Sequence, residues 1–140
     1  DGAKLSAEDE QEIARLAVDV RPAEPRSPRI KDKSDLLLRY EERFAQQFAR
    51  LDLTGRKVCV DAANGGGSLL APRILRAFGA DVVEIACEPD GFNINDGVGA
   101  LHPEPLRQAV LEHGANLGIC LDGDGDRTEM IGRCESVTCD

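Results

Sequence analysis

The sequence predicts an α/β fold: a three-layer α/β/α domain with a mainly parallel sheet, preceded by N-terminal helices. Two observations predict it. From Lys57 onward, short and nearly continuous apolar runs alternate with helix-like segments in the order β-α-β-α-β. Each apolar run is followed by a loop rich in glycine, asparagine or aspartate, as expected where a parallel strand ends and its connection begins.

Two helices and a linker are predicted before the sheet. Ser6 is placed as the N-cap of an amphipathic helix, AEDEQEIARLAV, whose acids gather in the first turn. Residues 19–35 hold three prolines and many charges, a composition typical of a linker at a domain boundary. The second helix is expected to be capped by Ser34 or Asp35 and to continue through Arg50.

Three strands and two helices are predicted after the linker. The strands are KVCVDAA, DVVEIAC and NLGICL, and the helices are SLLAPRILRAFGA and PEPLRQAVLEHGA. The loops that follow the strands are NGGGS, EPDGFNINDGVGALHPEP and DGDGDR. Ligands of parallel sheets bind beyond the carboxyl ends of the strands, so we expect these three loops to open on the same edge.

The composition excludes several classes of partner. Net charge is −9, from 26 acidic and 17 basic residues, which disfavours binding to nucleic acid or to anionic membranes. No apolar run approaches the length of a membrane span, and we find no signal peptide. The five cysteines show no disulfide framework, so we expect a cytoplasmic protein. Because the chain does not begin with Met, we expect it to be a processed chain or a piece of a longer protein.

Residues 122–127, DGDGDR, form the strongest chemical signal, and we call them the aspartate loop. The glycines let the backbone curl so that Asp122, Asp124 and Asp126 face one point. Three carboxylates stay ionised together only if a cation lies between them. Oxygen-only ligation suits a hard ion, Mg²⁺, Ca²⁺ or Mn²⁺, with positions left for water or phosphate. Arg127 could hold a phosphate beside that metal.

The aspartate loop also allows other interpretations. A solvated acidic turn is the simplest, and a non-catalytic metal-binding module is another. An EF-hand fails, because its sixth and twelfth positions hold Arg127 and Arg133 in place of Gly and Glu. The Asp-x-Asp spacing also resembles the haloacid-dehalogenase-like phosphatases, with Asp122 as nucleophile. Too little chain follows for that fold, so this alternative is the weaker one.

Other polar residues have less definite roles. Asn64 with Gly65–Gly67 could present backbone N–H groups to an anion or could simply form a tight turn, and both interpretations stay open. Asn93 and Asn95 are expected to satisfy backbone groups of their own loop. His102 and His113 are not expected to be catalytic.

Four segments together resemble the α-D-phosphohexomutase family. DGDGDR after a parallel strand resembles the metal loop of these enzymes, and VDAANGGGS resembles the loop that opens their second domain. CEPDGFNINDGVGA is similar to the branch that acts on glucosamine phosphates rather than to the phosphomannomutase/phosphoglucomutase branch, which remains an alternative. DGAKLSAEDEQEIARL resembles the end of their first domain. The resemblance runs from Asp1 to about Met130.

The resemblance implies a four-domain cytoplasmic enzyme that interconverts glucosamine 6-phosphate and glucosamine 1-phosphate. A phosphoserine in the first domain exchanges its phosphoryl group with the sugar, and Mg²⁺ lies between that phosphoserine and the aspartate loop. Asp122, Asp124 and Asp126 would then be the metal ligands, and Arg127 would contact the phosphoserine region.

The resemblance also divides the chain. Residues 1–33 would be the end of the first domain plus a linker, and residues 34–140 a second domain truncated at its C-terminal end. The catalytic serine and the sugar-binding loops lie outside these 140 residues, so the partners would be a phosphosugar and further domains of the same chain. We expect the isolated chain to be inactive. Residues 128–140 are expected to match the family poorly, and no strand is predicted there.

Overall fold

A computed structural model describes residues 5–18, 33–132 and 136–139. The chain divides into two compact units, residues 1–32 and residues 33–140. Across these described residues, no helix is long and apolar enough to cross a membrane.

The first unit contains helix α1 (Ala7–Val18), as predicted. Ser6 caps this helix, because its Oγ accepts a hydrogen bond from the backbone N–H of Asp9 at 3.1 Å and donates to the Asp9 carboxylate at 2.8 Å. No side chain of α1 is buried within its own unit. Within this unit, the helix is supported by local interactions such as this cap and the pairing of Arg15 with Glu12.

The second unit carries a five-stranded sheet and three helices among the described residues. The elements in chain order are α2 (Ser34–Gln47), β1 (Lys57–Asp61), α3 (Leu70–Ala77), β2 (Asp81–Ile85), α4 (Glu104–Glu112), β3 (Leu117–Leu121), β4 (Thr128–Ile131) and β5 (Ser136–Cys139). The strand order is β2-β1-β3-β4-β5. Strands β2, β1 and β3 run parallel, whereas β4 and β5 are antiparallel additions, so the predicted βαβαβ fold is confirmed.

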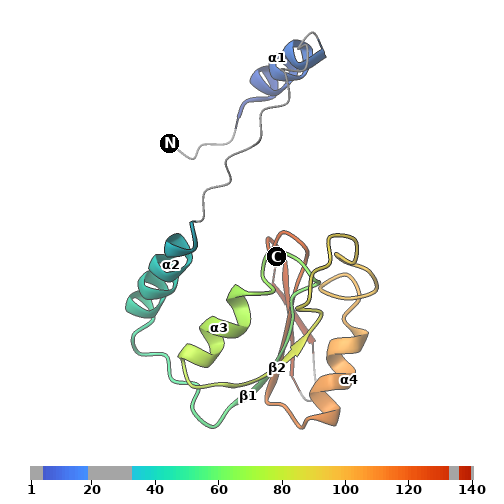
Figure 1. Cartoon of the computed structure of the whole chain (residues 1–140). Coiled ribbons are helices and arrows are strands. Elements are labelled where there is room, and N and C mark those ends of the chain that lie inside the picture. The colour runs from blue at the N-terminus through green and yellow to red at the C-terminus, as the bar shows by residue number, and fades with distance from the viewer. Residues whose placement is uncertain (1–4, 19–32, 133–135, 140) are drawn as a thin grey trace. The chain divides into compact units, whose positions relative to one another are not determined.

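Helices cover both faces of the sheet, which makes the unit three-layered (Figure 1). On the α4 face, Leu106 and Val110 pack with Cys59 and Cys120 of the central strands. On the opposite face, Leu75 of α3 packs against a cluster that includes Val58 and Val60. Strand β1 lies between the two clusters and is buried from its second residue to its last, which explains its continuous apolar run.

At the end of the chain, residues 128–131 form strand β4, where no strand was predicted. Its residues pair antiparallel with β3, with Ile131 opposite Gly118. Ile131 is 2% exposed and belongs to the core cluster under α4. An antiparallel strand can be buried on one face only, so the polar composition of TEMI concealed it.

The second helix also differs in detail from its prediction. It ends at Gln47 rather than Arg50, and Lys33 occupies its N-cap position without a capping side-chain hydrogen bond. Tertiary contacts with α3 hold it in place: Phe44 meets the edge of Phe78 at 6.1 Å between ring centroids, and Arg73 pairs with Glu41 at 2.8 Å. Packing therefore replaces the cap that the sequence suggested.

Candidate metal site

Three loops meet at the carboxyl edge of the parallel strands. They are the glycine loop after β1 (residues 62–69), the long loop after β2 (residues 86–103) and the aspartate loop after β3 (residues 122–127). Backbone N–H groups connect them: Gly66 donates to the carbonyl of Gly123 at 2.8 Å and Asn95 to that of Ala63 at 2.9 Å. Ala100 of the long loop donates to the carbonyl of Leu121, the last residue of β3, at 3.0 Å. The prediction that the three loops share one edge is confirmed.

The glycine loop and the aspartate loop approach each other too closely for side chains. A Cβ atom on Gly65 would lie 2.2 Å from the carbonyl oxygen of Gly123. A Cβ atom on Gly123 would in turn lie within 2.8 Å of Ile94 and Asn95 of the long loop. Gly65 is therefore required for backbone contact between the two loops, whereas the absence of a side chain at Gly123 makes room for the side chains of Ile94 and Asn95.

The three aspartates of the aspartate loop come together as predicted. One carboxylate oxygen from each of Asp122, Asp124 and Asp126 lies within 4.8 Å of the others. Asp122 is buried at the base of the loop, and the other two are exposed. The arrangement presents three hard oxygen donors on a partly open surface, the donor set that Mg²⁺ or Ca²⁺ prefers.

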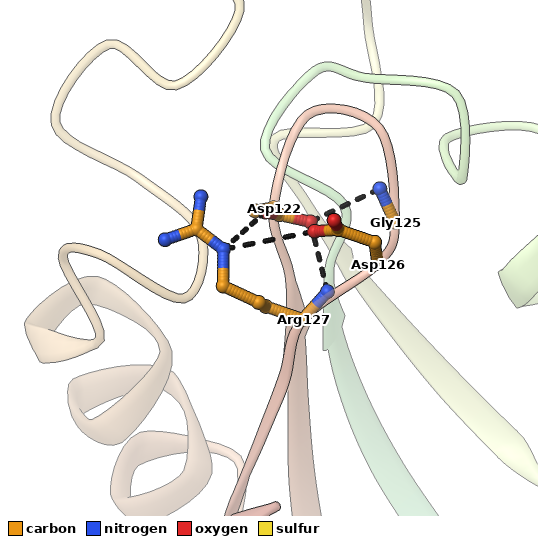
Figure 2. A network of polar contacts seen from close by, with 4 residues as sticks. All are labelled: Asp122, Gly125, Asp126 and Arg127. Atoms are coloured by element: carbon orange, nitrogen blue, oxygen red, sulfur yellow. Dashed lines mark hydrogen bonds and ion pairs between the residues drawn. The ribbon is translucent and has the colours of Figure 1, made fainter. Parts of the chain in front are cut away.

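Asp122 organises the aspartate loop through three hydrogen bonds (Figure 2). Its Oδ1 accepts from the backbone N–H of Gly125 at 3.0 Å and of Arg127 at 3.2 Å, and its Oδ2 accepts from Arg127 Nε at 2.6 Å. Burial alone would raise the pKa of Asp122, but the hydrogen bonds and charge of Arg127 outweigh it and lower the pKa to about 2. Asp122 is therefore a firmly ionised group.

The pKa of Asp126 is shifted in the opposite direction from that of Asp122. Its contact with Asp122 and the negative charges of Asp124 and Asp122 raise its pKa, and Arg127, 3.7 Å from its Oδ1, only partly offsets them. The raised pKa reflects negative charge that the loop does not neutralise by itself. A divalent cation between the three carboxylates would remove this repulsion.

The donor atoms fit a metal ion. A carboxylate oxygen can accept two hydrogen bonds, and Oδ2 of Asp122 accepts one. Asp124 accepts no hydrogen bond from any residue that the structure describes. Asp122 and Asp124 therefore each keep an oxygen lone pair that can bind a metal ion. The guanidinium of Arg127 already contributes one positive charge beside the loop.

Asp61 lies at the carboxyl edge of the sheet, beneath the three loops. No role was predicted for it from the sequence. It is the last residue of β1, its side chain is fully buried, and its two oxygens accept the N–H groups of Ala63 and Gly99, each at 2.9 Å. Burial raises its pKa, and the two hydrogen bonds offset only part of that effect. The sequence signal that could have identified Asp61 is a charged residue at the end of an apolar strand, in VDAANGGGS.

The glycine loop uses its amides within the fold, which favours the tight-turn interpretation over an anion site. The N–H of Asn64 donates to Ala86, that of Gly65 to Ala62, and that of Gly66 to the aspartate loop. The side chain of Asn64 also bridges to the long loop, accepting from the N–H of Glu88 at 3.1 Å.

Asn93 satisfies backbone groups of its own loop, as predicted, because it accepts from the N–H of Asp90 and donates to the carbonyl of Glu88. Asn95 differs from this prediction. Its backbone N–H pairs, but its buried Oδ1 has no hydrogen-bond partner among the described residues. His113 stands at the C-cap of α4, away from the aspartate loop.

Comparison with protein families identifies the domain. The family model described as "Phosphoglucomutase/phosphomannomutase, alpha/beta/alpha domain II" matches residues 39–135. The chain belongs to the phosphoglucomutase/phosphomannomutase family. The expectation that residues 128–140 match this family poorly was wrong as far as residue 135, because the match includes β4.

Curated relatives of this family are similar over most of the chain. A phosphoglucosamine mutase from Dinoroseobacter shibae is 47% identical over 134 residues, and one from Bordetella petrii is 52% identical over 107 residues. These alignments cover 94% and 76% of this chain, but only 30% and 23% of the relatives. The chain thus spans less than a third of the curated relatives that it matches.

A solved structure supports the same fold. A phosphoglucomutase/phosphomannomutase family protein from Burkholderia thailandensis matches with a TM-score of 0.57 and 32% identity. The match covers 70% of this chain and 22% of that protein. Sequence and structure therefore agree on the family and on the limited part of it that these residues represent.

Proposed function

We propose that these 140 residues are a segment of a phosphoglucosamine mutase, which interconverts glucosamine 6-phosphate and glucosamine 1-phosphate. Residues 1–33 are then the end of the first domain plus a linker, and residues 34–140 belong to the second domain. Eight relatives that carry the name phosphoglucosamine mutase, at 44–52% identity, support this branch over the phosphomannomutase/phosphoglucomutase branch. Family membership disfavours the Asp-nucleophile phosphatase.

The aspartate cluster is the observation that carries the proposal. Asp122, Asp124 and Asp126 are proposed to hold Mg²⁺, and their oxygens within 4.8 Å of one another support this assignment. When bound, Mg²⁺ would neutralise charge on phosphoryl oxygens during phosphoryl transfer. The buried, ionised Asp122 fixes the base of the site, and the two exposed aspartates leave one side open toward a phosphate.

Arg127 is proposed to contact the phosphoserine of the first domain. Its Nε binds the aspartates, while neither Nη atom has a hydrogen-bond partner within the described part of the chain. Figure 2 draws both Nη atoms pointing away from the carboxylates. A planar guanidinium with free donors can bind a phosphate while its Nε keeps Asp122 in place.

The remaining parts of the proposal concern partners and location. The substrate is a phosphosugar bound with the help of other domains of the same chain, and the enzyme is cytoplasmic. The net charge of −9 argues against nucleic acid and membrane surfaces as partners. Because the phosphoserine is proposed to lie outside residues 1–140, the isolated chain has no phosphoryl group to transfer.

A chimeric enzyme tests the function. Residues 1–140 replace the aligned segment of the Dinoroseobacter shibae phosphoglucosamine mutase, and conversion of glucosamine 1-phosphate is measured in the presence of Mg²⁺. We expect the chimera to be active and its Asp124→Asn variant to lose at least about 100-fold in kcat, the range for a lost electrostatic contact. A folded chimera without turnover, or one that tolerates Asp124→Asn, would contradict the proposal.

The isolated chain provides the complementary assay. We expect no conversion of glucosamine 1-phosphate and no phosphate release from simple phosphate esters. Phosphate release that disappears in Asp122→Asn would instead support the phosphatase alternative.

A further inference from the structure

Asp61 is a buried carboxylate that lies outside the proposed set of metal ligands. No cation contacts it within the described residues, and its hydrogen bonds come from two backbone N–H groups, one on each oxygen. A buried carboxylate without a counter-ion is costly, so aspartate at the end of an apolar strand calls for a specific reason. The partners of Asp61, Ala63 and Gly99, lie in two different loops of the metal edge.

On one side, Asp61 fixes the long loop against the start of the aspartate loop. Gly99, which donates to Asp61 Oδ2, packs so tightly that a Cβ atom there would lie 2.6 Å from the carbonyl oxygen of Leu121. The next residue, Ala100, donates its N–H to that same carbonyl at 3.0 Å. Leu121 immediately precedes Asp122, so this contact locates the base of the aspartate loop.

On the other side, Asp61 fixes the glycine loop, which supports the aspartate loop from behind. Ala63, held by Asp61 Oδ1, accepts the N–H of Asn95 at 2.9 Å. Asn95 occupies the space beside Gly123, where a Cβ atom would approach its side chain to 2.8 Å. Ala63 has a positive φ angle of 52°, which is costly for alanine and indicates that its surroundings hold it.

We propose that Asp61 is a positioning residue of the metal site. By binding the N–H groups of Ala63 and Gly99 together, its carboxylate holds the long loop against Leu121 and Gly123 and thereby keeps the three aspartates in a cation-binding arrangement. The inference rests on the proposed function in taking the aspartate loop as the metal site, but its effect on loop geometry is measurable without metal.

A matched pair of variants isolates the role of the second oxygen. In Asp61→Asn, the amide can accept from only one of the two N–H groups, and its NH₂ faces the other donor. Asp90→Asn is the control, because Asp90 lies in the same long loop and also accepts two backbone N–H groups. Asp90 uses Oδ1 for both, so asparagine keeps both bonds while removing the same charge.

The first measurement is amide hydrogen exchange of the 140-residue chain without metal. In Asp61→Asn we expect the amides of Ala100, Gly125 and Arg127 to exchange at least about tenfold faster, while amides in the centre of β1 keep their protection. Asp90→Asn should leave all of them unchanged. A uniform acceleration across the whole sheet, or no change at Gly125 and Arg127, would overturn the inference.

The second measurement is the dissociation constant for Mg²⁺ by calorimetry. Asp61→Asn should weaken binding at least about tenfold, and Asp90→Asn by no more than about twofold. Equal affinities in wild type and Asp61→Asn would overturn the inference. If wild type itself binds no Mg²⁺, the metal proposal fails, and the metal-free exchange pattern still decides whether Asp61 positions the loop.

A wild-type experiment keeps the inference testable if Asp61→Asn does not fold. Coupling between sites is reciprocal, so saturating Mg²⁺ should slow exchange of the Gly99 amide, which donates to Asp61, together with that of Gly125. Protection at Gly125 with no change at Gly99 would overturn the inference.

Discussion

Without a metal ion, the positive charge that faces the three aspartates of the loop comes from Arg127. Its Nε lies 2.6 Å from Asp122 and 3.7 Å from Asp126, and it partly balances three carboxylates. One positive charge cannot neutralise three negative ones, and the raised pKa of Asp126 is the result. The proposed divalent cation would complete the charge balance of the loop. Two predictions follow at the scale of single residues.

The first is that Mg²⁺ affinity falls at acidic pH because of Asp126. A ligand must be deprotonated to bind, and the pKa of Asp126 is raised whereas that of Asp122 is lowered to about 2. As pH decreases from 7, affinity should drop first where Asp126 takes up its proton, at a pH above the ordinary aspartate value. Asp126→Asn should bind more weakly at pH 7 and lose this step in a calorimetric pH series. An unchanged step in the variant would contradict the assignment.

The second prediction is that Arg127→Gln raises the pKa of Asp122 from about 2 toward the ordinary aspartate value. The rise should be partial, because the backbone N–H groups of Gly125 and Arg127 remain. A folded-state pKa below the unfolded one adds stability above the unfolded pKa, and this is lost as pH falls toward 2. The variant should therefore show a smaller loss of stability between about pH 4 and pH 2. Carboxyl NMR titration measures the pKa, with exposed Arg39→Gln as the control.

At the scale of elements, the metal edge depends on contact between loops. Gly65→Ala would place a methyl group 2.2 Å from the carbonyl oxygen of Gly123 and separate the two loops. We expect a loss of about 1–3 kcal/mol in the free energy of unfolding, typical of overpacking, together with weaker Mg²⁺ binding. Gly66→Ala is the matched control, because its Cβ would meet nothing closer than 3.8 Å. Urea unfolding of both variants measures the free energy of unfolding. An equal loss in Gly65→Ala and Gly66→Ala would contradict the argument that Gly65 is needed for close contact.

Strand β4, which no sequence pattern predicted, gives a second test at this scale. Ile131 is 2% exposed and packs beneath α4, so Ile131→Ala should cost about 2–5 kcal/mol. Its neighbour Met130 is 37% exposed, and Met130→Ala should change stability by only about 0.5 kcal/mol. Similar small effects for both substitutions, measured by urea unfolding, would mean that β4 is not part of the core.

At the scale of the whole molecule, the sequence predicted the parallel core but not its extensions. The strands β1, β2 and β3 were recognisable because each is a short apolar run between glycine-rich turns, and the chain order placed their loops on one edge. Strand β4 escaped prediction because its four residues bury little besides Ile131. The packing of α2 escaped prediction because its contacts with residues in and beside α3, such as Phe44 with Phe78 and Glu41 with Arg73, leave no local pattern in the sequence.

The candidate site was predictable to a similar degree. Alternating aspartates and glycines identified Asp122, Asp124 and Asp126, whereas the pairing of Arg127 with Asp122 depends on how the loop folds back on itself. Asp61 was not identified because its partner Gly99 lies 38 positions away in the chain. Long-range hydrogen bonds of this kind leave no spacing pattern in a single sequence.

Paramagnetic NMR with Mn²⁺ tests the central claim, that the aspartate loop is the metal site, most directly. Substoichiometric Mn²⁺ is added to the 140-residue chain and to its Asp124→Asn variant, which removes an exposed ligand without a hydrogen bond inside the described structure. We predict that amide signals of residues 122–127 broaden first in wild type and that the variant needs about tenfold more Mn²⁺ for the same effect. Broadening that begins at other acidic residues, or that is identical in the variant, would contradict the account.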